Sequence, residues 1–103
     1  MPKKVDVRII RVHGGNANWF VKKIEVEAGG KVTWYCKHYE IFVWFTDKHA
    51  LKLGKVHVHG TKGQVSVDVG TKKGRYFYAM MIKDDNGEMH LVEGNSPPEM
   101  VIE

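Results

Sequence analysis

The chain has 103 residues, with 16 basic and 12 acidic side chains, and its formal net charge is +4 when histidine is neutral. This length fits one domain, which we expect to span residues 1–103. Apolar residues make up 43% of the chain, a share that excludes a disordered tail and a collagen-like or membrane-spanning composition. The single cysteine excludes an intramolecular disulfide framework, whereas six histidines leave several potential metal ligands.

The first residues of the sequence do not show the pattern of a secretory signal, so none is expected in the chain as it stands. Residues 1–4 lead directly into alternating apolar residues, without the apolar stretch and cleavage site of a secretory signal. The longest apolar run, 41–45, is far shorter than the roughly 20 residues that a helix needs to cross a bilayer. We therefore expect no membrane span, and a cytoplasmic location as the chain stands, or a periplasmic or secreted one if a signal peptide has been removed. Lysines are spread without a dense run, so a nucleic-acid partner is not expected.

Apolar and polar residues alternate with a period of two, which is the repeat of a half-buried β-strand. The first alternation changes phase at Ile10 and Val12, which indicates a bulge or a switch between sheets. Segment 46–54 has weak periodicity and indicates a short helix or an irregular crossing. Seven or eight short strands with glycine-rich turns predict an all-β fold, either an antiparallel β-sandwich or a barrel. The expected strands lie within 5–12, 21–28, 32–36, 41–45, 56–59, 65–69, 76–83 and 100–103.

Two glycine-containing turns predict β-hairpins. The turn 60–63 joins the alternations 56–59 and 65–69. Asn86-Gly87 is the strongest short hairpin signal in the chain, because both residues tolerate positive φ. The carboxylates beside it are expected to be turn residues in solvent; they are Asp84, Asp85 and Glu88.

Four stretches of the chain together form a characteristic strand pattern. In 24–34 a strand ends at a Gly-Gly turn, and the next strand opens with Val-Thr-Trp. Residues 65–69 and 74–78 lead toward a loop, and 100–103 form a short closing strand. This pattern resembles the cupredoxin family. The resemblance implies a cupredoxin-like Greek-key β-sandwich, which in most members holds one copper ion for electron transfer.

The chain departs from that family at the copper ligands. A type 1 copper site needs a thiolate, two imidazoles and usually an axial thioether. Met80 stands where the family's aromatic-x-aromatic-x-Cys pattern has the cysteine, and the place of the first imidazole holds Glu40 or Ile41, with His38 displaced toward the turn. A predicted hairpin replaces the copper loop. We therefore expect a degenerate copper site and no resident cofactor.

The main alternative is an atypical copper-binding or electron-transfer protein. Cys36 could supply a thiolate, but it shares a predicted core face with Val32 and Trp34, which favours an inert buried residue. Met80 is likewise expected to fill core volume. The weak candidate metal ligands are Cys36, His38, His57, His59, Met80, Met89 and His90.

His57 and His59 lie on one face of a predicted strand and could chelate a divalent ion adventitiously. Two imidazoles are too few for a tight site, and a third would have to come from His13, His49 or His90. Solvent-facing histidines opposite a valine face are the simpler interpretation.

Four aromatic residues are the candidate binding residues: Trp19, Tyr39, Phe42 and Trp44. Phe42 and Trp44 lie on one face of 40–45, opposite the face that carries Ile41. An exposed aromatic face could take a partner protein, a small ligand or a sugar ring by stacking. The alternative is that the connection 37–55 folds back over it.

Motifs of hydrolytic or phosphate chemistry are missing from the sequence, so we do not expect an enzyme. The expected function is that of a non-catalytic cupredoxin-like binding module whose partner is an unidentified protein or small ligand. A small carbohydrate-binding module is the second alternative.

Overall fold

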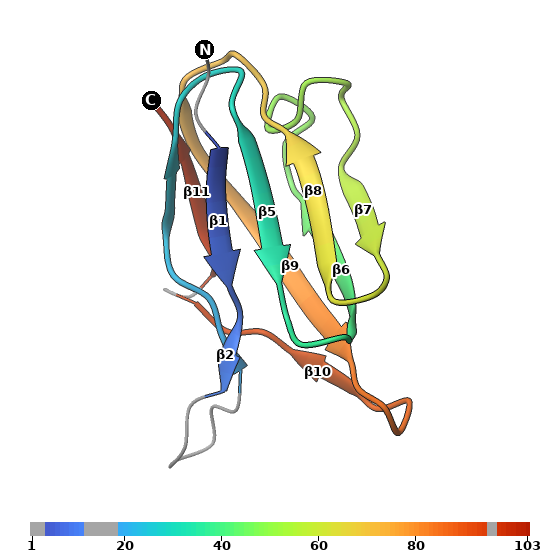
Figure 1. Cartoon of the computed structure of the whole chain (residues 1–103). Helices are drawn as coiled ribbons and strands as arrows, with labels where there is room; N and C mark the ends of the chain where they lie inside the picture. The colour runs from blue at the N-terminus through green and yellow to red at the C-terminus, as the bar shows by residue number, and fades with distance from the viewer. Residues whose placement is uncertain (1–3, 12–18, 95–96) are drawn as a thin grey trace.

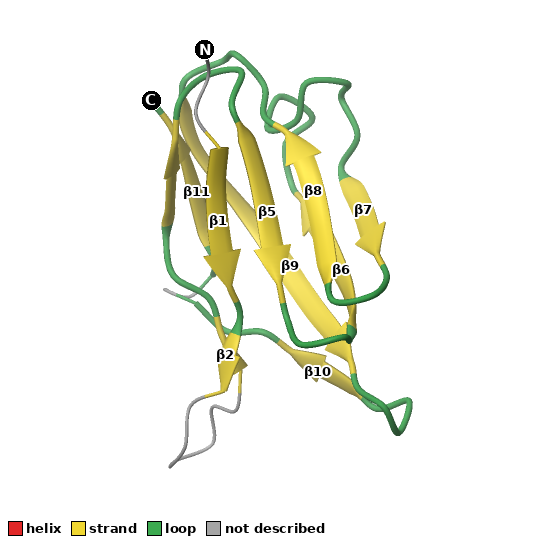
Figure 2. Cartoon of the chain, in the orientation of Figure 1, coloured by secondary structure: helices red, strands yellow, loops and turns green. Residues whose placement is uncertain are grey.

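The computed structural model describes residues 4–11, 19–94 and 97–103, and these ranges contain β-strands and no helix (Figures 1 and 2). In that part of the chain, therefore, no helix is long and apolar enough to cross a membrane. The all-β prediction is confirmed. The strands are β1 (Lys4–Arg8), β2 (Ile10–Arg11), β3 (Trp19–Phe20), β4 (Ile24–Val26), β5 (Lys31–Tyr35), β6 (Glu40–Phe45), β7 (His57–Gly60), β8 (Gln64–Asp68), β9 (Gly74–Lys83), β10 (Met89–Leu91) and β11 (Glu99–Ile102).

These strands form a sandwich of two main sheets. The smaller sheet has the order β1-β5-β8, and the larger has the order β4-β11-β9-β6-β7, with β10 added beside the end of β9. Figure 1 shows the smaller sheet in front of the larger one, with the short ribbon of β2 and β3 extending below. The described ranges hold eleven strands instead of seven or eight because short pieces such as β2, β3 and β10 pair separately.

Two strand pairs are parallel, which the antiparallel prediction did not include. β1 runs parallel to β5, and β11 runs parallel to β4. Parallel neighbours need a long crossover connection. Between β1 and β5 the chain supplies it by passing through β4, which belongs to the other sheet.

The core lies between the sheets and is filled by alternate residues of each strand. Trp34 is fully buried; its indole N–H donates to the Tyr78 hydroxyl at 3.4 Å, and its ring centroid lies 5.6 Å from that of Tyr78. Burial raises the pKa of Tyr78, and the bond from Trp34 opposes that rise. The inward-facing sets follow the predicted phases: Val32, Trp34 and Cys36; Ile41, Val43 and Phe45; Val65 and Val67; Tyr76, Tyr78, Met80 and Ile82.

The two predicted hairpins have different outcomes. Asn86-Gly87 does join the antiparallel strands β9 and β10, with Gly87 at φ 81°. The turn 60–63 closes no hairpin, because β7 pairs with β6 in the larger sheet whereas β8 pairs with β5 in the smaller. Both strands present valines to one core, and that core lies between the sheets, so the chain must cross from one sheet to the other.

The weakly periodic segment 46–54 crosses irregularly and contains no helix. An antiparallel bridge between Leu51 and Val69 joins it to the start of the connection between β8 and β9. The predicted switch between sheets after Ile9 is observed, because β1 ends at Arg8 and β2 pairs with β3 in a separate ribbon. The predicted change of phase at Ile10 is not observed, since Ile10 is exposed beside the buried Ile9, as unbroken alternation would place it. The predicted continuation through Val12 and the turn 14–16 lie outside the described residues.

Gly63 fixes the crossing between β7 and β8 against the turn before β6. It has φ 81°, its amide donates to the Tyr39 carbonyl at 3.0 Å, and its carbonyl accepts the Cys36 amide at 3.0 Å. A Cβ at this position would overlap the backbone carbonyl oxygen of Lys37. The residue must therefore be glycine for two independent reasons, conformation and space.

We expect Gly63→Ala to lower the free energy of unfolding by about 3 kcal/mol, since it adds a backbone clash to left-handed strain. Gly54→Ala is the matched control, because Gly54 has φ +73° but open space where its Cβ would be. It should cost only about 1 kcal/mol. Urea unfolding with unchanged m-values measures both, and equal losses in the two variants would contradict the steric argument.

Candidate functional site

One face of β6, β7, β9 and β10 points away from the core. Residues opposite each other across strands point to the same side of a sheet. On this side Trp44 is paired with His57 and with Ala79, whereas Phe42 is paired with His59 and Met81. Leu91 lies across from Met81 and extends the face onto β10. We call this surface the outer aromatic face; it comprises Phe42, Trp44, His57, His59, Phe77, Ala79, Met81, Met89 and Leu91.

Large apolar side chains of this face remain accessible to solvent. Trp44 is 37% exposed, Phe77 38%, Met89 43% and Leu91 60%. The connection that follows β6 therefore does not fold back over the face. Single exposed apolar residues are ordinary on protein surfaces, but contiguous exposed ones are typical of binding sites.

The aromatic rings of β6 are stacked against the histidines of β7. The rings of Phe42 and His59 are 4.3 Å apart and 6° from parallel, and those of Trp44 and His57 are 5.0 Å apart at 18°. His57 Nδ1–H donates to the Val43 carbonyl at 3.1 Å, and His59 Nε2 lies 3.0 Å from a Glu40 carboxylate oxygen. The two imidazoles are thus oriented by neighbours within the sheet through one ring nitrogen each, and their rings form part of the face.

A concave region adjoins the face beside β9. It has a volume of about 350 Å³, and its walls include Ala79, Leu91, Val92 and the Pro97-Pro98 pair. Most of these groups are apolar. The surface is therefore concave at this point, and the recess can receive a side chain of a bound molecule.

Trp19 and Tyr39 lie apart from this face. Trp19 is only 5% exposed and packs edge-on against Tyr39 with ring centroids 5.9 Å apart. The Lys37 ammonium lies about 5.9 Å from the Trp19 ring centroid. The predicted aromatic patch is therefore divided, and Trp19 must be corrected from an exposed binding residue to a buried one.

Four further members of the outer aromatic face were not among the predicted site residues: Phe77, Ala79, Met81 and Leu91. The signal for three of them was present, since the core-facing alternation of Tyr76, Tyr78 and Met80 sends the residues between and after them outward. Leu91 could not be placed from the sequence, because its position depends on the register of β10 against β9.

Among the described residues, the predicted copper ligands do not lie together as a type 1 set. The site needs a thiolate, which forms poorly here because burial raises the pKa of Cys36 to about 11, despite the opposing charge of Lys37. Cys36 and Met80 are both core residues, 1% and 0% exposed. Met89 is exposed on β10. His38 pairs with Asp85 and His90 with Asp84 at the hairpin end. The candidate ligands therefore do not converge as a copper set.

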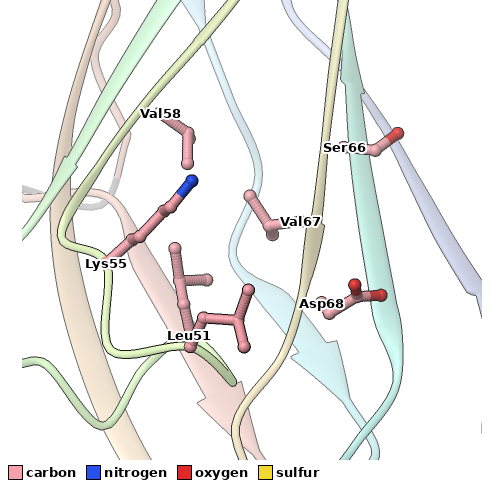
Figure 3. A pocket seen from close by; sticks show the side chains of 7 residues that line it. Leu51, Lys55, Val58, Ser66, Val67 and Asp68 are labelled. Carbon is pink, nitrogen blue, oxygen red and sulfur yellow. The ribbon is translucent and has the colours of Figure 1, made fainter.

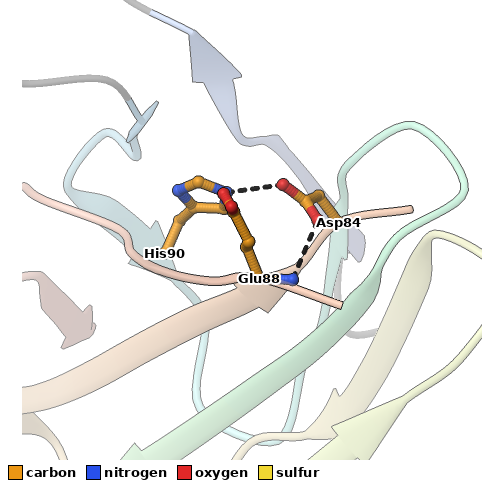
Figure 4. Close-up of side chains that lie close together, drawn as sticks. All are labelled: Asp84, Glu88 and His90. Carbon is orange, nitrogen blue, oxygen red and sulfur yellow. Dashed lines mark hydrogen bonds and ion pairs between the residues drawn. The ribbon is translucent and has the colours of Figure 1, made fainter. Parts of the chain in front are cut away.

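Within the described residues, one group of three potential ligands does come together, and it consists of Asp84, Glu88 and His90 (Figure 4). His90 Nε2 lies 2.8 Å from Asp84 Oδ2, while Asp84 Oδ1 accepts the amides of Asn86 and Glu88 at 2.9 and 3.0 Å. The hydrogen bond to His90 is the main reason that the pKa of Asp84 lies below its ordinary value. Both Asp84 oxygens hold the hairpin, so this group is a turn clamp.

The comparisons with known proteins give little beyond a general likeness. No family model and no curated protein sequence matches the chain. The chain is similar to a solved structure, native pseudoazurin from Hyphomicrobium denitrificans, a cupredoxin. The sequence identity is 20% and the TM-score 0.44, with 91% of this chain and 77% of that chain covered. These values carry no conclusion about a site, which therefore depends on the geometry above.

The Asp84 clamp makes a prediction about pH. Because the folded-state pKa of Asp84 is lowered, the carboxylate stabilises the hairpin above the ordinary aspartate pKa, and this contribution disappears as pH falls through the lowered value. His90→Gln should shift the Asp84 titration upward, toward the ordinary value. Carboxyl-detected NMR titration measures both proteins. An unchanged Asp84 midpoint in the variant would contradict the assignment of His90 as the main cause.

Copper should bind without a blue chromophore. We expect Cu²⁺ titration to give no intense visible charge-transfer band, because such a band needs a copper-bound thiolate and Cys36 is buried and protonated. Cys36→Ala is the control, since it should leave any weak histidine-based copper binding unchanged. An intense visible band that the Cys36→Ala variant lacks would overturn this interpretation.

Proposed function

We propose that the chain is a non-catalytic binding module that docks a partner protein through its outer aromatic face. The observation that carries the proposal is the contiguous exposure of Trp44, Phe77 and Leu91 on one side of the larger sheet. Apolar patches of this kind, with aromatic and methionine side chains, match the composition of protein interfaces. The recess of about 350 Å³ beside Ala79 and Leu91 suits an anchoring side chain of the partner.

The stacking pattern favours a protein over a sugar. A sugar ring binds by lying on an open aromatic face. Here the rings of Phe42 and Trp44 are stacked on His59 and His57 and also lie 6.1 Å apart and 13° from parallel with each other, so their faces are turned toward neighbouring side chains. Leu91 and Met89 extend the surface with flexible aliphatic groups, which pack well against protein side chains.

The binding role is also favoured over catalysis by what the face contains. Its imidazoles belong to His57 and His59, and the register also brings Glu40 and Lys83 to its edge, where the Glu40 carboxylate is paired with His59 and Lys83. General acid or base chemistry needs a titratable group within hydrogen-bond reach of a substrate. The face instead presents carbon atoms, which favour burial against another apolar surface.

Site-specific photo-crosslinking tests the proposal in cells that express the chain. A photoreactive phenylalanine analogue in place of Phe77 should give one discrete protein adduct. The same analogue in place of Gln64, exposed on the smaller sheet, is the control and should give none. Adding Trp44→Ala to the Phe77 probe should remove the adduct. Equal adducts from both positions, or an adduct that persists with Trp44→Ala, would contradict docking through this face.

Affinity for the crosslinked protein gives the quantitative test. Trp44→Ala should weaken purified-complex binding by about 2 kcal/mol, or about 30-fold in Kd, as expected for an aromatic anchor. Leu53→Ala is the matched control, because Leu53 is 79% exposed but lies off the face. It should leave Kd unchanged, and thermal melts should show that both variants remain folded.

A further inference from the structure

Two connections at one end of the sandwich bring together lysines that are far apart in the sequence. Lys48 and Lys52 lie on the connection after β6, and Lys72 lies on the connection between β8 and β9. Figure 1 shows these connections at the top of the molecule, at the opposite end from the β9–β10 hairpin. The three lysines share a cavity of about 220 Å³ with His49 and Thr71. None of the described residues that line it is acidic.

The backbone that carries the lysines is held rigidly. The Gly70 amide donates to the Ala50 carbonyl at 2.9 Å, and the Lys52 amide donates to the Asp68 carbonyl at 3.0 Å. The buried Tyr76 donates its hydroxyl to the Lys72 carbonyl at 2.6 Å. Gly70 permits the close approach, because a Cβ there would overlap the carbonyl oxygen of His49. These hydrogen bonds therefore hold the two connections in place as the wall of the cavity.

The lysines of this cavity are not neutralised by neighbouring acids. Among the described residues, the lysine ion pairs involve Lys23 and Lys83 and none of the three cavity lysines. Asp47 precedes Lys48 in the chain and the Asp68 carbonyl accepts the Lys52 amide, but among the described residues neither carboxylate forms an ion pair with a cavity lysine. Asp47 Oδ1 accepts the His49 amide at 2.8 Å. Figure 3 shows the Asp68 carboxylate on the opposite side of β8 from Leu51.

We propose that Lys48, Lys52 and Lys72 form a binding site for a phosphate group. Like charges held at one place repel each other, and a compact dianion removes that cost while accepting hydrogen bonds from several ammonium groups. The Thr71 hydroxyl adds a neutral donor at the cavity. The open cavity leaves room for whatever carries the phosphate. This site lies apart from the outer aromatic face and is independent of the proposed docking role.

The test uses the full chain and two sources of phosphate. Inorganic phosphate at low ionic strength should give saturable NMR shifts at the amides of Gly54, Gly70 and Thr71. In a second arm, vesicles of phosphatidylcholine with phosphatidic acid are sedimented with the protein. Saturation in the first arm assigns the site to free phosphate. Saturation in the second arm alone assigns it to a lipid phosphate.

Two variants with the same net charge test whether binding depends on these particular lysines or only on the total charge of the chain. The site variant Lys48→Gln/Lys52→Gln/Lys72→Gln should bind at least about tenfold more weakly, because charged hydrogen bonds are lost. The control variant Lys4→Gln/Lys22→Gln/Lys62→Gln removes the same charge from exposed lysines elsewhere and should bind nearly as well as the unaltered chain. No saturation in either arm, or an equal loss in both variants, would overturn the proposal.

Discussion

The outer aromatic face depends on the position of β9, which pairs with three other strands. It lies between β6 and β11 in the larger sheet, and its last residues also pair with β10. Since strand side chains alternate, the burial of Tyr78 and Met80 determines to which side of the sheet the neighbouring side chains point. Ala79 and Met81 must point outward, beside Trp44 and Phe42. A shift of one residue in this register would bury the outward set and expose the core.

The same alternation explains how much of the fold follows from the sequence. The inward faces around Trp34, Ile41 and Met80 were predicted correctly because each is a local property of one strand. Partner strands are not local. The turn 60–63 has hairpin chemistry, yet it links two sheets, since nothing within 56–69 specifies which strand lies beside it. The parallel pairing of β1 with β5 is non-local for the same reason.

The same distinction applies to the candidate site: features that depend on one strand could be predicted, and features that depend on strand pairing could not. Phe42 and Trp44 could be assigned to one face because they are two residues apart on one strand. Their stacking on His59 and His57 could not, because it requires the register between β6 and β7. Trp19 was placed wrongly because its strand has two residues, too few to show alternation, and its burial comes from tertiary contacts with residues such as Tyr39.

The distribution of lysines shows a limit of reasoning from sequence spacing. Lys52 and Lys72 are 20 positions apart, and each lies in a connection that looks like ordinary solvated surface. The bridge between Leu51 and Val69 brings their connections together, and Gly70 removes the side chain that would hold them apart. A search of the sequence detects lysines that are close along the chain. A phosphate is attracted by the local electrostatic potential, which depends on lysines that are close in the folded structure. The modest net charge of this sequence is therefore a poor guide to its local field, because none of the described residues that line the lysine cavity is acidic.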